Sequence, residues 1–225
     1  MTGFAATMLA EIGLDVTVPQ PIRAYFEWIE ANGLDRHFDG SEGYRHAILD
    51  AALEESCMGI IPPDPDHARL WTGATDPDIG KRLVPFCKTG GDGSYAAFWA
   101  DDAGKTHIVH LGSGSGSTMI GVMADNAVDF LRLLAIGYDE LCWPEQHGMT
   151  PQEIHEEEYP EEDYEGMEDE RPPMPAKPEA LRTWVSETFN VTVPERAADI
   201  IGEMPDMDGD AGSDPFAQWL ATVHG

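Results

Sequence analysis

The stretch that decides the fold is "KRLVPFCKTGGDGSYAAFWADDAGKTHIVHLG", Lys81 to Gly112. It contains three short segments rich in aromatic and β-branched residues, a composition typical of strands. Gly and Asp separate these segments, and such residues form the tight turns of β-hairpins. The stretch therefore predicts a meander of antiparallel neighbours. Its strands are expected at Leu83 to Phe86, Tyr95 to Trp99 and Ile108 to Leu111.

Helical patterns flank this meander on both sides. "DNAVDFLRLLAIGYDEL" follows a capping residue, Asp125, and predicts a helix from about Asn126 to Leu141 that packs on the sheet. Two amphipathic helices are expected earlier in the chain, at Pro21 to Gly33 and Gly43 to Gly59. Shorter helices are expected later, in "EALRTWVSETF", "ERAADIIGEM" and "DPFAQWLATVHG".

These elements predict an α+β fold, with a mainly antiparallel sheet packed by helices in a single domain. Five large apolar residues are expected in the core: Phe86, Phe98, Phe130, Leu134 and Trp219. Trp99 alternates with Phe98 along its strand, so it is expected on the other face of the sheet.

Charge restricts the possible partners. Among 225 residues, 42 are Asp or Glu and 13 are Lys or Arg, which gives a formal net charge of −29. Such a charge repels nucleic acid and anionic membranes and attracts basic proteins. The expected partner is therefore a protein, with no role for nucleic acid or membrane.

The cysteines and the apolar segments predict a cytoplasmic location. Cys57, Cys87 and Cys142 are widely spaced and never form a Cys-x-x-Cys pair, so buried reduced thiols are expected. The first residues, "MTGFAATMLAEIG", have neither a basic region nor a long apolar run.

The most abrupt change of composition begins at Glu153. "EIHEEEYPEEDYEGMEDE", Glu153 to Glu170, holds 11 acids in 18 residues and no Lys or Arg, and "RPPMPAKP" follows with four prolines. Residues 153–178 are therefore interpreted as an acidic, Pro-rich linker or surface insertion. Residues 1–152 and 179–225 are assigned to one domain.

Three motifs suggest binding chemistry, but each departs from its pattern. "GSGSGS", Gly112 to Ser117, is followed by strand-like residues where a phosphate loop would lead into a helix. His107 and His110 lie three apart on a strand, so they are expected on opposite faces. "DMDGDAGSD", from Asp206, has Ala where a calcium loop needs Gly and again where it needs Glu.

The sequence evidence for a catalytic site is equally weak. "GSGSG" matches the letters of a nucleophile elbow but runs into a strand. Asp101 and Asp102 are adjacent, which separates their carboxylates and suits a solvated turn better than an acid and base pair. We expect no enzymatic activity, no cofactor and no metal.

The order of motifs from Leu83 to Leu141 resembles the SUKH superfamily. The shared features are a strand ending in Pro-Phe, a Gly-Asp-Gly-Ser-Tyr turn, a Trp-containing strand, an Asp and Gly turn, an "LGS" strand end and a Phe-Leu-x-Leu-Leu helix. "WVSETFNVTVP" and "DPFAQWL" resemble its closing segments, so the similarity covers about half of the chain.

This resemblance implies an α+β fold and, as in many bacterial members, an immunity protein that binds and neutralises a cognate toxin, often a nuclease. It brings no catalytic residues. The first alternative is a regulatory or scaffolding protein that binds a host protein, as in the related regulators of yeast cell-wall synthesis. A small hydrolase is the alternative from another class.

The expected partner-binding surface is acidic. It combines the turn after the central strand with the acidic segment, whose tyrosines would serve as anchors. The other interpretation is that the segment is only a solvating linker. The predicted binding residues are Asp101, Asp102, Glu156, Glu157, Glu158, Tyr159, Glu161, Glu162, Asp163 and Tyr164.

Overall fold

The computed structural model describes residues 3–13, 16–37, 45–64, 66–74 and 76–223. Within them, seven strands form one antiparallel sheet in sequence order, which confirms the predicted fold class. The strands are β1 (Asp35–His37), β2 (Arg45–Ala47), β3 (Gly59–Ile60), β4 (Leu83–Lys88), β5 (Tyr95–Ala100), β6 (Thr106–Leu111) and β7 (Ile120–Ala124).

The predicted meander is confirmed as the centre of the sheet. Phe98 on β5 lies opposite Val84 on β4 and Ile108 on β6. The two connecting turns use glycines with positive φ, Gly93 at 98° and Gly104 at 78°. Because an L side chain rarely adopts these angles, each turn depends on its glycine.

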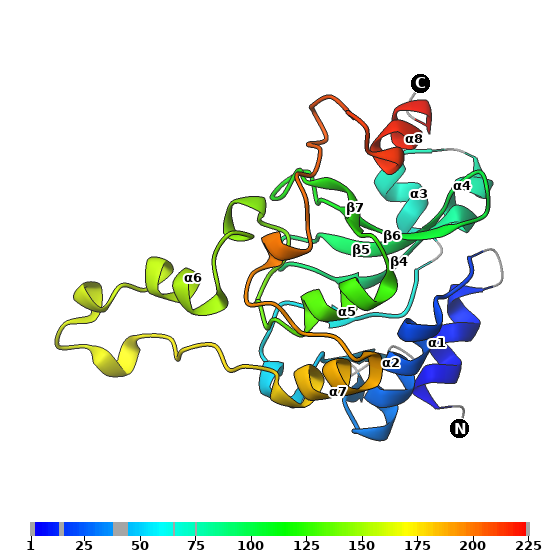
Figure 1. Cartoon of the computed structure of the whole chain (residues 1–225). Helices are drawn as coiled ribbons and strands as arrows, with labels where there is room; N and C mark the ends of the chain where they lie inside the picture. The colour runs from blue at the N-terminus through cyan, green and yellow to red at the C-terminus, as the bar shows by residue number, and fades with distance from the viewer. Residues whose placement is uncertain (1–2, 14–15, 38–44, 65, 75, 224–225) are drawn as a thin grey trace.

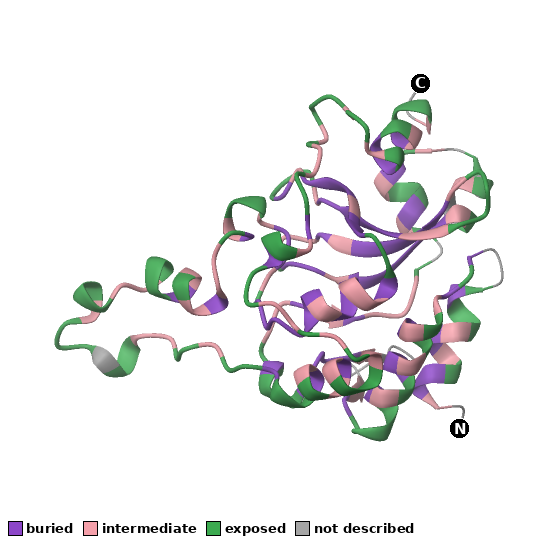
Figure 2. Cartoon of the chain, viewed as in Figure 1, coloured by how far each residue is buried: buried purple, intermediate pink, exposed green. Residues whose placement is uncertain are grey.

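Helices cover both faces of the sheet (Figure 1). The first face packs against α1 (Phe4–Ile12), α2 (Gln20–Ala31), α5 (Ala127–Leu134) and α7 (Glu179–Phe189). The second packs against α3 (His67–Thr72) and α8 (Pro215–Val223), and α4 (Pro77–Arg82) leads into β4. The central strands are therefore buried along nearly their whole length, as Figure 2 shows.

Stacked aromatic rings fill the first face. The Phe86 ring lies 3.9 Å from that of Phe98 and 5.6 Å from that of Phe130, measured between centroids. Leu134 is also buried, so four of the five core predictions are confirmed. The core prediction for Trp219 is wrong, because α8 directs Phe216 into the sheet and leaves Trp219 half-buried at the rim. Trp99 lies buried on the second face, where its ring centroid is 5.4 Å from that of Phe216.

Three predicted helices differ from the structure. Gly43 and Tyr44 lie outside the described residues, and the rest of the predicted helix to Gly59 consists of β2, a 3-10 turn η1 (Ala51–Leu53) and the start of β3. The segment "ERAADIIGEM" forms only a 3-10 turn, η5 (Ala197–Asp199).

The helix expected to reach Leu141 ends at Leu134. Gly137 has a φ of 96°, and a Cβ there would lie 2.6 Å from Cδ of Pro178. This close approach of Pro178 requires a glycine and a non-helical backbone at residue 137. The apolar residues Ala135, Ile136, Tyr138 and Leu141 remain buried, so their spacing reflected burial in a turn rather than a longer helix.

Two carboxylates, one remote in sequence and one local, hold the C-terminal helices. Buried Asp50 accepts a hydrogen bond of 2.8 Å from the Leu181 N–H in the first turn of α7. Asp214 caps α8 by accepting from the N–H groups of Phe216 and Ala217, and it also accepts from Val122 on β7. The first turn of a helix has unpaired N–H groups, and these side chains satisfy some of them.

Candidate partner-binding surface

The acidic segment forms an arm that projects from one side of the body (Figure 1). It follows α6 (Pro151–Glu158), passes through two 3-10 turns, η3 (Glu161–Tyr164) and η4 (Glu168–Glu170), and returns along residues 171–176. We call residues 159–176 the arm. Most of its residues are exposed or half-buried (Figure 2).

The predicted linker start lies inside a docked helix. Thr150 and Glu153 form a capping box at the start of α6, and Glu153 pairs with Arg196 at 2.9 Å. The Thr150 N–H and the Arg196 guanidinium lower the pKa of Glu153. Ile154 packs against the core. The freely projecting segment therefore begins after Glu158.

Hydrogen bonds close the base of the arm. His155 donates through Nε2 to the Pro172 carbonyl at 2.9 Å. Arg171 donates through Nε to the Tyr159 carbonyl at 2.8 Å, and its guanidinium lies 3.5 Å from Glu161. These bonds join the outgoing and returning chains, so the arm has a defined base.

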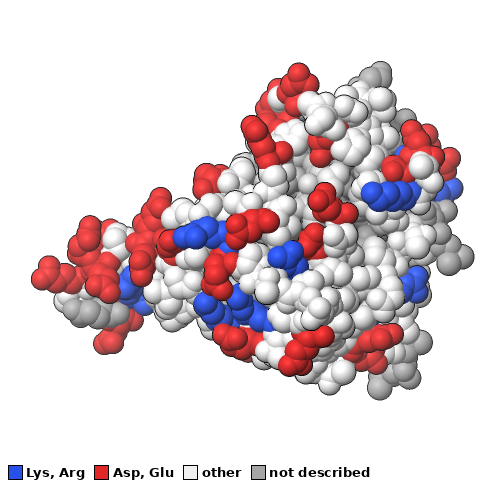
Figure 3. Space-filling view, viewed as in Figure 1, with Lys and Arg blue, Asp and Glu red and all other residues white. Residues whose placement is uncertain are grey.

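The predicted acidic binding residues at the end of α6 and in the arm present their charges to solvent. Tyr159 and Tyr164, which lie among these acids in the sequence, are each half-buried. The carboxylates dominate the arm surface in Figure 3. The exposed acids from the predicted set are Glu156, Glu157, Glu158, Glu161, Glu162 and Asp163.

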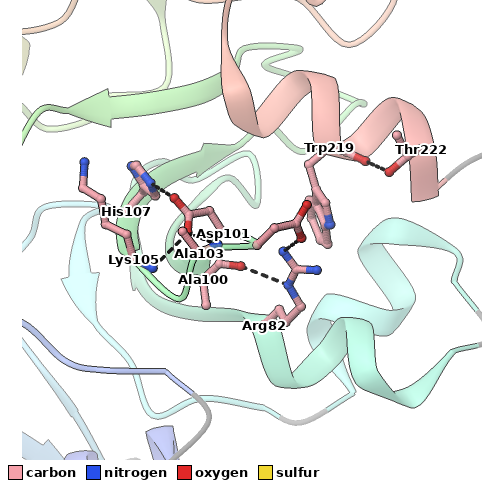
Figure 4. A network of polar contacts seen from close by, with 9 residues as sticks. Arg82, Ala100, Asp101, Ala103, Lys105, His107, Trp219 and Thr222 are labelled. Carbon is pink, nitrogen blue, oxygen red and sulfur yellow. Dashed lines mark hydrogen bonds and ion pairs between the residues drawn. The ribbon is translucent and has the colours of Figure 1, made fainter.

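The structure does not bring Asp101 and Asp102 together with this surface. Their turn lies beside α4, whereas the arm projects from the other side of the body (Figure 1). Asp101 accepts from the N–H groups of Ala103 and Lys105 and binds His107 at 2.9 Å, as Figure 4 shows. The hydrogen bond to His107 is the main reason that the pKa of Asp101 is lowered.

Asp102 has a local partner as well. Its exposed carboxylate lies 2.7 Å from the Arg82 guanidinium. The same guanidinium lies 5.5 Å from the centre of the Trp219 ring and donates to the Ala100 carbonyl (Figure 4). The turn therefore links β5 to α4 and α8, and its carboxylates already have partners within the chain.

A groove lies at the base of the arm, and sequence reasoning missed it. It has a volume of about 630 Å³ and is bounded by residues 52–56, by residues 137–146, by α6 and by the returning chain of the arm. Two of these walls come from segments for which the sequence predicted helices. No local pattern could place four separate segments around one groove.

Thr89 and His110 form the polar pair that most resembles a nucleophile and its base, and both are fully buried. His110 donates through Nδ1 to the Met119 carbonyl at 2.8 Å, and its Nε2 accepts from the Thr89 hydroxyl at 3.0 Å. Both residues are 0% exposed, and burial lowers the pKa of His110 to about 4. His107 instead binds the Asp101 carboxylate of its own turn.

Asp92 joins two glycine-rich loops. Its carboxylate accepts from both the hydroxyl and the N–H of Ser94, from the Ser113 hydroxyl and from the Ser117 N–H. Burial alone would raise the pKa of Asp92, but these hydrogen bonds lower it to about 2. "GSGSGS" therefore connects β6 to β7 and is held by the β4–β5 turn.

The cysteines are free thiols. Cys87 and Cys142 are buried as predicted, whereas Cys57 is half-buried. Burial raises the pKa of Cys87 to about 12. Among the described residues, no group of three or more His, Cys, Asp or Glu could hold a metal ion.

Comparison of the chain with family models, curated proteins and solved structures finds no match. In the part of the chain that the structure describes, no helix has the length and apolarity to cross a membrane.

Proposed function

We propose that this chain is a non-catalytic protein-binding module, an immunity protein that docks on a basic protein toxin and neutralises it. The observation that carries this proposal is the acidic arm, which projects its carboxylates beyond the body. A nuclease needs a basic cleft to bind phosphates. An acidic projection can fill such a cleft through complementary charge and exclude the substrate.

The closed base of the arm supports a binding role over that of a solvating linker. A segment that serves only as a linker needs no hydrogen bonds between its two ends. Here His155 and Arg171 hold the outgoing and returning chains together. A preordered projection loses less conformational entropy on binding. Half-buried Tyr159 and Tyr164 add aromatic area of the kind that is enriched at binding hot spots.

A hydrolase receives less support. Thr89 and His110 are buried and satisfy each other and a backbone carbonyl, which is how structural polar pairs behave. The arrangement that would favour a hydrolase is an accessible nucleophile beside a base.

Growth protection tests the proposal. We expect the gene beside this one to encode a basic protein that stops bacterial growth when it is expressed alone. Co-expression of this chain should restore growth, and the two purified proteins should bind. Unchanged toxicity with both proteins present would refute the immunity role. Binding to a non-toxic host protein would instead support the regulatory alternative.

A further inference from the structure

The groove at the base of the arm has an acidic lining. Five carboxylates line it: Glu54, Glu55, Asp139, Glu140 and Glu158. None of the described lining residues is Lys or Arg. Apolar side chains, among them Trp143 and Met174, complete the walls. A ligand in this groove would therefore meet negative charge beside apolar surface.

Three of these carboxylates accept hydrogen bonds from neutral donors, whereas Glu54 lies 4.0 Å from the Arg36 guanidinium. Asp139 accepts from the Cys57 N–H and Glu158 from the Gln146 amide. Glu140 accepts from the Gly91 N–H and from the Trp143 indole. These bonds fix the carboxylates in place while their negative charge remains available to a cation.

The returning chain of the arm adds hydrogen-bond acceptors to the groove and few hydrogen-bond donors. The wall that it forms is "PPMPA", residues 172–176, in which three of five residues are proline and lack an N–H. A wall of this composition offers carbonyl oxygens with only two backbone donors. The groove as a whole therefore favours a ligand that is rich in hydrogen-bond donors.

His155, on the α6 wall of the groove, provides an independent observation. It lines the groove and is 7% exposed, and its Nδ1 has no hydrogen-bond partner among the residues that the structure describes. Because Nε2 donates to the Pro172 carbonyl, the Nδ1 atom of a neutral ring is an acceptor. A buried acceptor without a partner is destabilising, and a hydrogen-bond donor from a ligand would satisfy it.

We propose that this groove binds an extended Lys- or Arg-bearing segment of the basic protein partner. Guanidinium and ammonium groups are donors without acceptors, so they match a lining of carboxylates and carbonyls. Their aliphatic stems would pack on the apolar walls around Trp143 and Met174. This inference rests on the proposed function and deepens it, because it assigns the chemistry of the docked segment.

Two methionines provide a matched pair of variants. Met174 lines the groove and is 45% exposed, whereas Met167 near the arm tip is 48% exposed and does not line it. Met174→Arg places a competing guanidinium beside the carboxylates, and Met167→Arg adds the same charge elsewhere. The probe is a fluorescein-labelled hexapeptide of alternating Arg and Ala, with binding followed by fluorescence anisotropy.

We expect Met174→Arg to raise the Kd of this peptide about tenfold, since one added charge near the site costs more than 1 kcal/mol. Met167→Arg should change the Kd less than threefold. The double variant Glu55→Gln with Glu158→Gln should also weaken binding. A control double variant, Glu187→Gln with Glu203→Gln, removes the same charge outside the groove and should have little effect.

Three results would overturn the groove assignment: equal weakening by both arginine variants, an unchanged Kd in Met174→Arg, or no binding of the wild type at millimolar peptide. Growth protection separates this inference from the proposed function. If Met174→Arg still binds and neutralises the toxin fully, the groove assignment fails alone. If the peptide binds the groove but growth is not restored, the immunity role fails alone.

Discussion

Acid should destabilise the fold through His110. The imidazole is completely buried and neutral, and burial lowers its pKa to about 4, whereas an unfolded chain gives His a pKa of about 6.5. Between these values the unfolded chain binds a proton that the folded chain does not. The contribution of His110 to stability is therefore complete above pH 6.5 and is lost as the pH falls toward 4.

The size of the effect follows from the two pKa values. From pH 7 to pH 5, one such group lowers the free energy of unfolding by about 2 kcal/mol. Burial also lowers the pKa of His147 and His67, and these groups add losses in the same direction. Burial raises the pKa of Glu11, which acts in the opposite direction, so the share due to His110 is isolated with a variant.

Urea unfolding at pH 7 and at pH 5, followed by tryptophan fluorescence, measures the loss. His110→Asn keeps a donor for the Met119 carbonyl but cannot titrate, so it should lose about 2 kcal/mol less than the wild type over this range. Thr89→Val removes the hydroxyl partner and keeps the imidazole, so its pH dependence should match the wild type. An equal pH dependence in His110→Asn and the wild type would refute the assignment of the effect to His110.

Three further changes test other contacts by urea unfolding. Asp92→Asn removes acceptor capacity from four donors and should lower the free energy of unfolding by about 2 kcal/mol, while exposed Asp125→Asn should change it by less than 0.5 kcal/mol. Gly121→Ala should cost about 2 kcal/mol or more, because φ is 129° and the new Cβ would lie 2.9 Å from the Asp214 carboxylate; a neutral result would show that this approach is relaxed easily. Replacement of residues 160–170 by Gly-Ser-Gly should change stability by less than about 1 kcal/mol, since the arm adds little apolar burial, and a larger loss would place the arm in the core.

The centre of the fold was predictable because its signals are local. In Leu83 to Leu111, glycine turns and β-branched or aromatic runs specify strands and hairpins within a few residues of each other. The helix α2 has a proline near its start and a regular apolar face, and both signals come from its own residues.

The errors occur where tertiary contacts override local pattern. Ala47, Ile48 and Leu49 are buried in succession because β2 joins the sheet and Leu49 accepts a hydrogen bond from the Tyr25 hydroxyl. The apolar spacing of that segment also fits a helix, and nothing within it reveals these partners. The inward position of Phe216 in place of Trp219 likewise depends on how α8 docks on the second face of the sheet.

For the proposed binding surface, the sequence predicted which residues are acidic and exposed but not how they are arranged. A run of carboxylates indicates exposure wherever it occurs in a fold. The closure of the arm depends on Arg171 and on His155, which is buried within the acidic run. The separation of Asp101 from the arm depends on which end of the sheet each turn occupies, and that becomes visible only in three dimensions.

The central claim is that the acidic arm steers this protein onto a basic partner. It is tested most directly by stopped-flow association with that partner at 20 and 200 mM NaCl. The arm variant combines Glu162→Gln, Asp163→Asn and Glu165→Gln, three exposed charges within the arm. The control combines Asp125→Asn, Glu187→Gln and Glu203→Gln, which removes three exposed charges outside the arm.

We predict that at low salt the arm variant associates several-fold more slowly than the control, with a weaker salt dependence and a similar dissociation rate. Exposed charges act mainly on the encounter of two proteins, and salt screens them. Equal association rates for the two variants at both salt concentrations would contradict the claim and would leave only the overall net charge to attract the partner.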